Sequence, residues 1–281
     1  MKLFDNIFKK SLNKANPDIE AELIMDNKPD DFDNTFSQNV EFFETSIRAA
    51  RKMLATKDYD GLNKYLRMLT LRENLEVVHT NLSNPGEKNT QINSFFGLFD
   101  EIVHSLSLEG IDVEIKEYAF NIHKDDEAIY QRVGYIVSAD QKPTFSIKER
   151  PILLNCWNKD RVATNISSIG KNNILDARND ILNTYLYPLD LVTCSGGNHR
   201  QLSAILDNAT GHTSVIEQLT DVRPLYPIVR FDGNNFVTKN GDIIYSVSNS
   251  VELLIGTFYE IGRILLKDPG YYPKFVSTYI K

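Results

Sequence analysis

The chain has 281 residues, of which 42% are hydrophobic and 25% charged, a composition that excludes an intrinsically disordered protein. Its 31 basic and 38 acidic side chains give a net charge of −7, which argues against non-specific coating of DNA because that requires a basic face. No apolar run approaches the roughly 18 residues that a membrane-spanning helix needs.

The first 38 residues are expected to form an N-terminal arm or linker. They are polar and acidic beyond residue 10, and Pro17 and Pro29 interrupt them. Residues 3–8 have helical spacing, which favours a helix docked on the protein over one lying on a membrane surface. The start lacks the long apolar core of a secretory signal, and the chain has only 2 cysteines, so a reducing cytoplasm is the expected compartment.

Residues 39–110 are expected to form a helical region. Apolar side chains recur at intervals of three and four in runs that begin near Phe42, Leu62 and Ile92. The breaker Asn84-Pro85-Gly86 separates the last two runs.

Charge is unevenly distributed between the halves of the chain. Residues 1–140 carry 16 basic and 25 acidic side chains, a balance of 16 − 25 = −9. Residues 141–281 carry 15 and 13, a balance of 15 − 13 = +2. This asymmetry indicates two parts with different roles.

Residues 111–281 are expected to mix strands and helices. Alternating or continuous β-rich runs predict strands within 111–120, 130–137, 145–157, 189–193, 227–231 and 235–245. Helices are predicted from Ile174 to Pro188, over 201–208, and over 250–266 with Ser250 as its cap. The predicted fold class is therefore α+β, with a helical N-terminal region followed by a mixed α/β domain.

One segment has the arrangement of an anion site. Ser195-Gly196-Gly197-Asn198-His199-Arg200 stands between a predicted strand and a predicted helix. The glycines allow close approach to the backbone, and a helix N-terminus attracts negative charge. Arg200 can grip a phosphate, and His199 can bind it or act as an acid or base. The alternative is a purely structural turn, with Asn198 as the helix cap and Arg200 in solvent.

This segment resembles two related families. Gly196-Gly197-Asn198-His199-Arg200 is similar to the Gly-Gly-Cys-His-Arg box of sulfiredoxins and to the Gly-Glu-Arg-Arg box of ParB-type partition proteins, which share a fold. The resemblance covers about residues 145–235. It implies a ParB/sulfiredoxin-like domain whose box holds the phosphates of a nucleotide. The whole chain also resembles members of a bacterial family of unassigned function that occurs in mobile-element neighbourhoods.

The departures from these families limit what the resemblance implies. The nucleophilic cysteine of sulfiredoxins falls at Asn198, so sulfinic-acid reduction is not expected. Cys194 is expected to be packed rather than reactive. The second motif of ParB proteins has no downstream match, and Glu73-Asn74-Leu75 lies far upstream, so partition activity and a preference for CTP are not expected.

Other polar groups give weaker predictions. The remaining histidines are scattered, so no metal site is predicted, and Asp125-Asp126-Glu127 is expected to be a solvated loop. If Mg²⁺ accompanies a nucleoside triphosphate, Asp190 and Asp176 are the candidate ligands. Arg223 and Arg230 are expected either to reach an anion or to lie in solvent, and Arg178 and Asp180 lie on a polar helix face. The aromatic residues Phe95, Phe96 and Phe99 belong either to the core or to a stacking platform. The C-terminal tail from Tyr271 to Tyr279 is either exposed or docked.

The functional expectation is a cytoplasmic protein that binds a nucleotide or another phosphorylated ligand at Gly196–Arg200. If it is an enzyme, a nucleotide hydrolase or nuclease is expected, with His199 and Arg200 as catalytic residues. A rival interpretation is a non-enzymatic protein-interaction module, whose helical region captures a protein partner near Arg48 and Arg51. A metal-dependent nuclease is a third alternative, but it needs a basic path that the scattered Arg and Lys do not indicate.

Overall fold

The computed structural model describes residues 34–83, 93–120, 135–137, 142–156, 158–170, 173–176, 181–207 and 211–280. Residues Thr35–Lys281 form one compact unit. The fold is α+β with a helical N-terminal region, as predicted. The predictions for residues 3–8, 84–86, 125–127, 178 and 180 lie outside the described residues, as do the side chains of Phe95 and Phe96.

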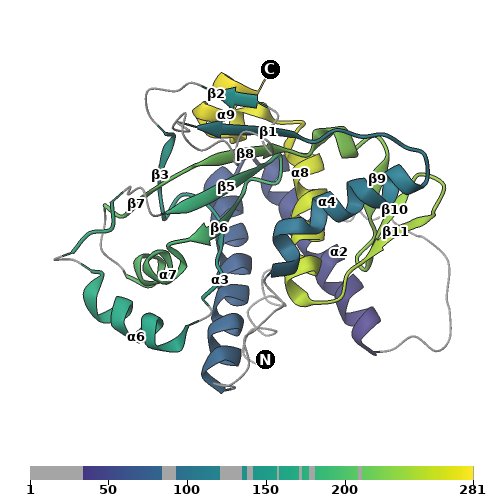
Figure 1. Ribbon diagram of the computed structural model, residues 1–281. Helices are drawn as coiled ribbons and strands as arrows, with labels where there is room; N and C mark the ends of the chain where they lie inside the picture. The colour runs from purple at the N-terminus through teal and green to yellow at the C-terminus, as the bar shows by residue number, and fades with distance from the viewer. Residues whose placement is uncertain are drawn as a thin grey trace. The chain divides into compact units, whose positions relative to one another are not determined.

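Three helices make up the N-terminal region: α2 (Asn34–Ala55), α3 (Tyr59–Ser83) and α4 (Asn93–Leu108) (Figure 1). Helix α2 begins inside the expected arm. The apolar stripes are buried, with Ala50, Leu62 and Ile102 each at 0% exposure. These side chains share one core with residues from the C-terminal part, including Leu191 and Phe258, so the helices are not a separately packed body.

A six-stranded mixed sheet lies at the centre of the C-terminal part, in the order β2-β1-β8-β5-β6-β4. Its strands are β1 (Lys116–Phe120), β2 (Tyr135–Val137), β4 (Ile152–Leu153), β5 (Leu182–Tyr187), β6 (Leu191–Gly196) and β8 (Gln218–Asp221). Strand β4 is an edge strand and pairs in parallel with β6, with Ile152 opposite Val192 and Leu153 opposite Thr193.

Both faces of this sheet are covered. Successive residues along a strand point to opposite faces of the sheet, so they belong alternately to two buried clusters. Leu153, Leu186 and Leu191 belong to the first cluster. Ile152, Tyr185 and Val192 belong to the other. The first cluster includes α3 and α8 (Ser250–Leu265), and the second includes α6 (Lys159–Ser168), α7 (Asn198–Leu206) and α9 (Lys274–Tyr279).

The remaining elements complete the two cores. A three-stranded antiparallel sheet consists of β9 (Val229–Phe231), β10 (Asn235–Thr238) and β11 (Ile243–Ser246), and Gly233 and Gly241, both at positive φ, lie in the turns on either side of β10. Strand β3 (Thr144–Ser146) pairs with β7 (Thr213–Val215). Two short 3₁₀ helices are η3 (Arg223–Leu225) and η4 (Pro269–Tyr271). Across the described ranges, no helix combines the length and apolarity needed to cross a membrane.

The helix predicted from Ile174 to Pro188 is wrong, because residues 182–187 form strand β5. In a central strand both faces are buried, so the alternation that marks an exposed strand is lost and the apolar spacing imitates a helix.

The structure also decides three smaller expectations about the helix cap, residues 111–115 and the C-terminal tail. The last helix is capped by Asn249, not Ser250, and the Asn249 side chain accepts from the Glu252 N–H. Residues 111–115 alternate as predicted but form no strand. The C-terminal tail is docked: Tyr271 is 6% exposed and Val276 3% exposed.

Asp190 is a structural residue in this fold. Its side chain is fully buried in the β5–β6 turn, at a φ of 53°. The carboxylate accepts hydrogen bonds from the Tyr185 hydroxyl at 2.6 Å and from Arg150 Nη1 at 3.0 Å. The prediction that Asp190 is a metal ligand has no support in this geometry, because its oxygens are committed to the core.

Replacing Arg150 with methionine would leave the Asp190 charge buried without its partner. Burial raises the pKa of Asp190, and the Arg150 charge opposes that rise. We expect Arg150→Met to lower the free energy of unfolding by about 3–5 kcal/mol near pH 7. Without Arg150 the native pKa rises further above the unfolded value of about 3.9, so the loss should shrink at about pH 4, where the carboxyl is protonated more fully.

Chemical denaturation at both pH values measures this loss, and Arg51→Met on the exposed face of α2 is the matched control. A variant as stable as the control near pH 7 would contradict the buried ion pair.

Candidate functional site

The parallel pairing of β4 and β6 brings two helix N-termini together. Each strand is followed by a short connection and a helix, α6 after β4 and α7 after β6. Because the strands are parallel neighbours, their carboxyl ends lie at the same edge of the sheet. Crevices outside the carboxyl ends of parallel strands are common ligand sites in α/β proteins. Here the crevice also collects the positive ends of two helix dipoles.

Gly196 and Gly197 make the turn from β6 into α7, and each is required for a different reason. Gly197 is the N-cap of α7 at a φ of 84°, in the left-handed region that favours glycine. A Cβ on Gly196 would come within 3.1 Å of the Leu182 side chain. Because Gly197 occupies the N-cap position, Asn198 is not the cap that the structural alternative expected. The backbone of this turn is left bare of side chains.

Asn198 and His199 brace the crevice from the first turn of α7. Both side chains are 6% exposed. Asn198 Oδ1 accepts from the Asn155 N–H at 2.8 Å, and His199 Nε2 accepts from the Asn158 N–H at 3.1 Å. These two bonds fix the segment that leads from β4 into α6. Both residues therefore have a structural role, in addition to any role toward a ligand.

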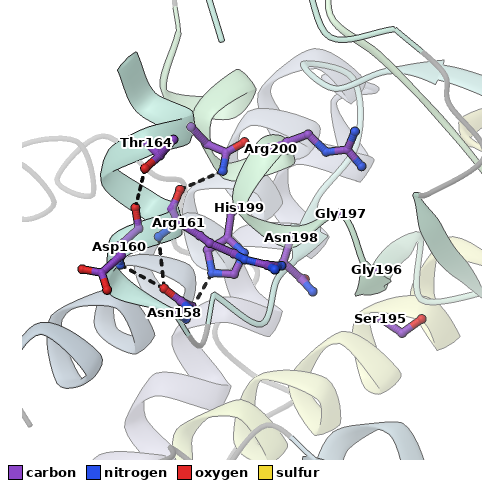
Figure 2. Close-up of a pocket in the computed structure, with 11 residues that line it drawn as sticks. Asn158, Asp160, Arg161, Thr164, Ser195, Gly196, Gly197, Asn198, His199 and Arg200 are labelled. Carbon is purple, nitrogen blue, oxygen red and sulfur yellow. Dashed lines mark hydrogen bonds between the residues drawn. The ribbon is translucent and has the colours of Figure 1, made fainter. Parts of the chain in front are cut away.

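Helix α6 supplies a residue that the sequence analysis missed. Asn158 caps α6 and accepts from the N–H groups of Asp160 and Arg161. Arg161 then projects from the first turn of α6 toward His199 and Asn198 (Figure 2). Arg200 extends from α7 in a different direction, away from the His199 ring (Figure 2). One arginine from each helix thus stands at the crevice.

A cavity of about 560 Å³ occupies this crevice. Its volume lies within the range typical of small-molecule sites. Two arginines and one carboxylate, Asp160, supply its charges. The lining residues are Asn158, Asp160, Arg161, Thr164, Asn165, Ser195, Gly196, Gly197, Asn198, His199 and Arg200. All six residues predicted from the sequence for phosphate binding therefore lie in one cavity.

A buried polar network holds α7 in place behind the cavity. Asn183 Nδ2 donates to Gln201 Oε1 at 3.2 Å and to Ser214 Oγ at 2.8 Å. Gln201 Nε2 donates to Asn183 Oδ1 at 2.9 Å and to Cys194 Sγ at 2.9 Å. Burial raises the pKa of Cys194 to about 12, so this thiol is packed and inert, as predicted. Fully satisfied networks of this kind rigidify their surroundings.

Helix α3 fixes β4 from the other side. Asn74 Nδ2 donates to the Ile152 carbonyl at 2.9 Å, and Asn74 Oδ1 accepts from the Leu154 N–H at 2.8 Å. Seven residues, or about two turns, further along α3, Asn81 Nδ2 donates to the Cys156 carbonyl at 2.8 Å. Asn74 therefore satisfies the backbone hydrogen-bonding groups at the open edge of β4. This structural role explains why the Asn74 side chain is buried and requires no ligand.

Several other predicted candidates lie away from the cavity. Arg223 forms an ion pair with Asp221 at 2.7 Å, and Arg230 is exposed on β9. Asp176 does not line the cavity. His212 lies 2.8 Å from Asp207 and accepts from the Leu175 N–H. Within the described segments, no group of three His, Cys, Asp or Glu side chains could hold a metal ion.

The missed contribution of α6 has a physical reason. The helix sequence KDRVATNISS contains few apolar residues, so it shows no clear stripe. Its only strong signal is the capping residue Asn158, whose type favours a helix start. Combined with the β-rich run just before it, that cap could have predicted α6 and placed Arg161 in its first turn.

Gly197 offers a test of the turn geometry. A side chain in the left-handed region costs about 1–2 kcal/mol, so we expect Gly197→Ala to lower the free energy of unfolding by that amount. The matched control is Gly97→Ala inside α4, where a Cβ meets nothing within 4 Å. That change should stabilise by up to about 1 kcal/mol through helix propensity. Urea denaturation measures both, and equal effects would contradict the left-handed cap.

His199 offers a test by pH. Its pKa is lowered, because burial and the positive charge of Arg161 disfavour the protonated ring. The stabilising contribution of the neutral ring is therefore complete above the unfolded pKa of about 6.5 and is lost as the pH falls below it. We expect stability to fall more steeply from about pH 7.5 to about pH 5.5 in the wild type than in His199→Gln, whose amide oxygen can still accept from Asn158.

The exposed His79 on α3 supplies the control substitution, His79→Gln. Parallel pH profiles for the wild type and His199→Gln would show that His199 does not titrate differently in the folded protein.

Comparisons with known proteins give one match. Neither a search of curated proteins nor a search of solved structures found a match. A family model described as a family of unknown function, DUF6710, matches residues 9–269. That span includes every residue that lines the cavity. The chain therefore belongs to the DUF6710 family.

Proposed function

We propose that the cavity between α6 and α7 binds the phosphate groups of a nucleotide or of another phosphorylated small molecule. The observation that carries this proposal is the convergence of two helix N-termini and two arginines, Arg161 and Arg200, on one cavity of about 560 Å³. Helix N-termini attract anions, and arginine binds phosphate with paired hydrogen bonds. The site is local, so the overall charge of −7 does not oppose it.

The parts of the cavity suggest distinct roles toward such a ligand. The bare turn at Gly196 and Gly197 would let a phosphate approach the backbone of α7 closely. Arg161 and Arg200 would supply charge from opposite helices. Among the described residues, Asp160 is the only carboxylate that lines the cavity, so it is the candidate partner for a sugar hydroxyl or for an accompanying Mg²⁺.

The ParB/sulfiredoxin-like assignment stays a prediction, as do the cytoplasmic location and any catalytic role of His199 and Arg200. His199 Nε2 is occupied by the Asn158 N–H in this structure, which favours binding or bracing over proton transfer at that atom. The proposal is therefore for ligand binding, and it commits to no reaction.

Titration calorimetry of the full chain with ATP, CTP, GTP and their diphosphates, each with Mg²⁺, tests the proposal. Removing a charged hydrogen-bond donor costs about 1.5–3 kcal/mol, so Arg161→Ala and Arg200→Ala should each weaken binding roughly tenfold to a hundredfold. Arg230→Ala is the matched control, because Arg230 is exposed on β9 and lies outside the cavity. Absence of binding by every nucleotide would exclude the nucleotide version, and equal binding by all variants would exclude this cavity.

One observation supports the rival protein-interaction module. Met68, Leu75 and Leu82 are exposed by 42%, 43% and 55%, and they recur every seven residues along α3. Residues at that spacing share one face of a helix. If protein interaction is the function, Arg200→Ala should leave partner binding unchanged.

A further inference from the structure

A second cavity, of about 250 Å³, lies at the opposite end of β4 from the first. Three segments that are distant in sequence enclose it: the first turns of α3, the loop that precedes β4, and Tyr271 of η4. None of its lining residues contributes to the first cavity. It is therefore a separate feature of the fold.

The second cavity is positively charged although the chain is acidic. Its lining includes four basic side chains, Lys64, Arg67, Lys148 and Arg150, against the acids Asp60 and Glu149. Asp60 is paired with Lys64 at 2.6 Å. Arg150 is committed to the buried Asp190.

Arg67 is the basic group of this cavity that lacks a compensating ion pair. It is half-buried, and in the part of the chain that the structure describes it forms no salt bridge within 4.0 Å. Burial lowers the pKa of Arg67, and the charge of Asp60 only partly opposes that effect. A bound anion would compensate this partly desolvated charge.

One polar atom of the same cavity wall, Asn63 Oδ1, is buried without a hydrogen-bond partner among the described residues. Such atoms are rare in native proteins and call for an explanation. Asn63 Oδ1 can only accept a hydrogen bond, so its complement is a donor such as a hydroxyl group.

The Tyr271 ring is held in place by its neighbours. Its side chain is 6% exposed. The Tyr59 ring packs edge-on against it, with centroids 5.9 Å apart and an interplanar angle of 72°. The Tyr59 hydroxyl in turn donates to Asp268 Oδ2 at 2.5 Å. The Tyr271 hydroxyl forms a hydrogen bond with the buried Asp190 carboxylate. Tyr271 is therefore a fixed part of the cavity wall, which is the preorganisation that a binding site needs.

We propose that this second cavity binds a small phosphate monoester that also carries hydroxyl groups, of the size of a triose phosphate. The phosphate meets Arg67, and a hydroxyl of the ligand donates to Asn63 Oδ1. With a volume less than half that of the first cavity, the site favours the compact ligand. This inference does not depend on the function proposed for the first cavity.

Calorimetry of the full chain with glycerol 3-phosphate, inorganic phosphate and glycerol tests the proposal. We expect glycerol 3-phosphate to bind, inorganic phosphate to bind more weakly and glycerol not to bind. Arg67→Gln should weaken the binding of glycerol 3-phosphate at least tenfold.

Two controls separate this cavity from the rest of the molecule. Arg48→Gln changes an exposed arginine on α2 and should leave the affinity unchanged. Arg161→Ala, in the first cavity, should also leave it unchanged. The proposal is overturned if glycerol 3-phosphate does not bind, if inorganic phosphate binds as tightly, or if Arg161→Ala abolishes binding while Arg67→Gln does not.

Discussion

The parallel register of the two-residue strand β4 on β6 is the constraint on which the candidate site depends. It aligns the carboxyl ends of the two strands, so α6 and α7 begin beside each other. A strand this short cannot hold its register through sheet hydrogen bonds alone. Asn74 on α3 therefore bonds to its free edge, while Asn81, Asn198 and His199 hold the residues that follow it. The N-terminal helices are thus part of the site's support, although none of their residues lines the first cavity.

This arrangement changes how the Gly-Gly-Asn-His-Arg segment is understood. A phosphate loop suggests that each polar side chain faces the ligand, yet Asn198 and His199 face protein backbone and are almost fully buried. The cavity is also lined by the bare glycine turn, by Arg200, and by Arg161 from the neighbouring helix (Figure 2). In the proposed site, recognition of charge would therefore be divided between two segments that are far apart in sequence.

The parts of the fold that could be predicted are those with local signals. The helical stripes of α2 and α3 have such signals, and the six residues from Ser195 to Arg200 were found as one segment. Strand β5 was lost because burial on both faces removed its alternation, and α6 because its apolar residues are few. Arg161 joins Arg200 only through the pairing of β4 with β6, a non-local contact that no single stretch of sequence encodes.

Strand β4 also connects the two cavities. The loop from Lys148 to Arg150, just before the strand, lines the second cavity, and the residues from Asn158 onward line the first. Helix α3 spans this whole segment, since Asn63 donates to the Glu149 carbonyl and Asn81 to the Cys156 carbonyl. A packed helix bonded at both ends of a segment resists its sliding, so each cavity keeps its shape independently unless β4 itself shifts. Strand β4 is therefore the segment that both cavities share, and its register on β6 is the same constraint that assembles the first of them.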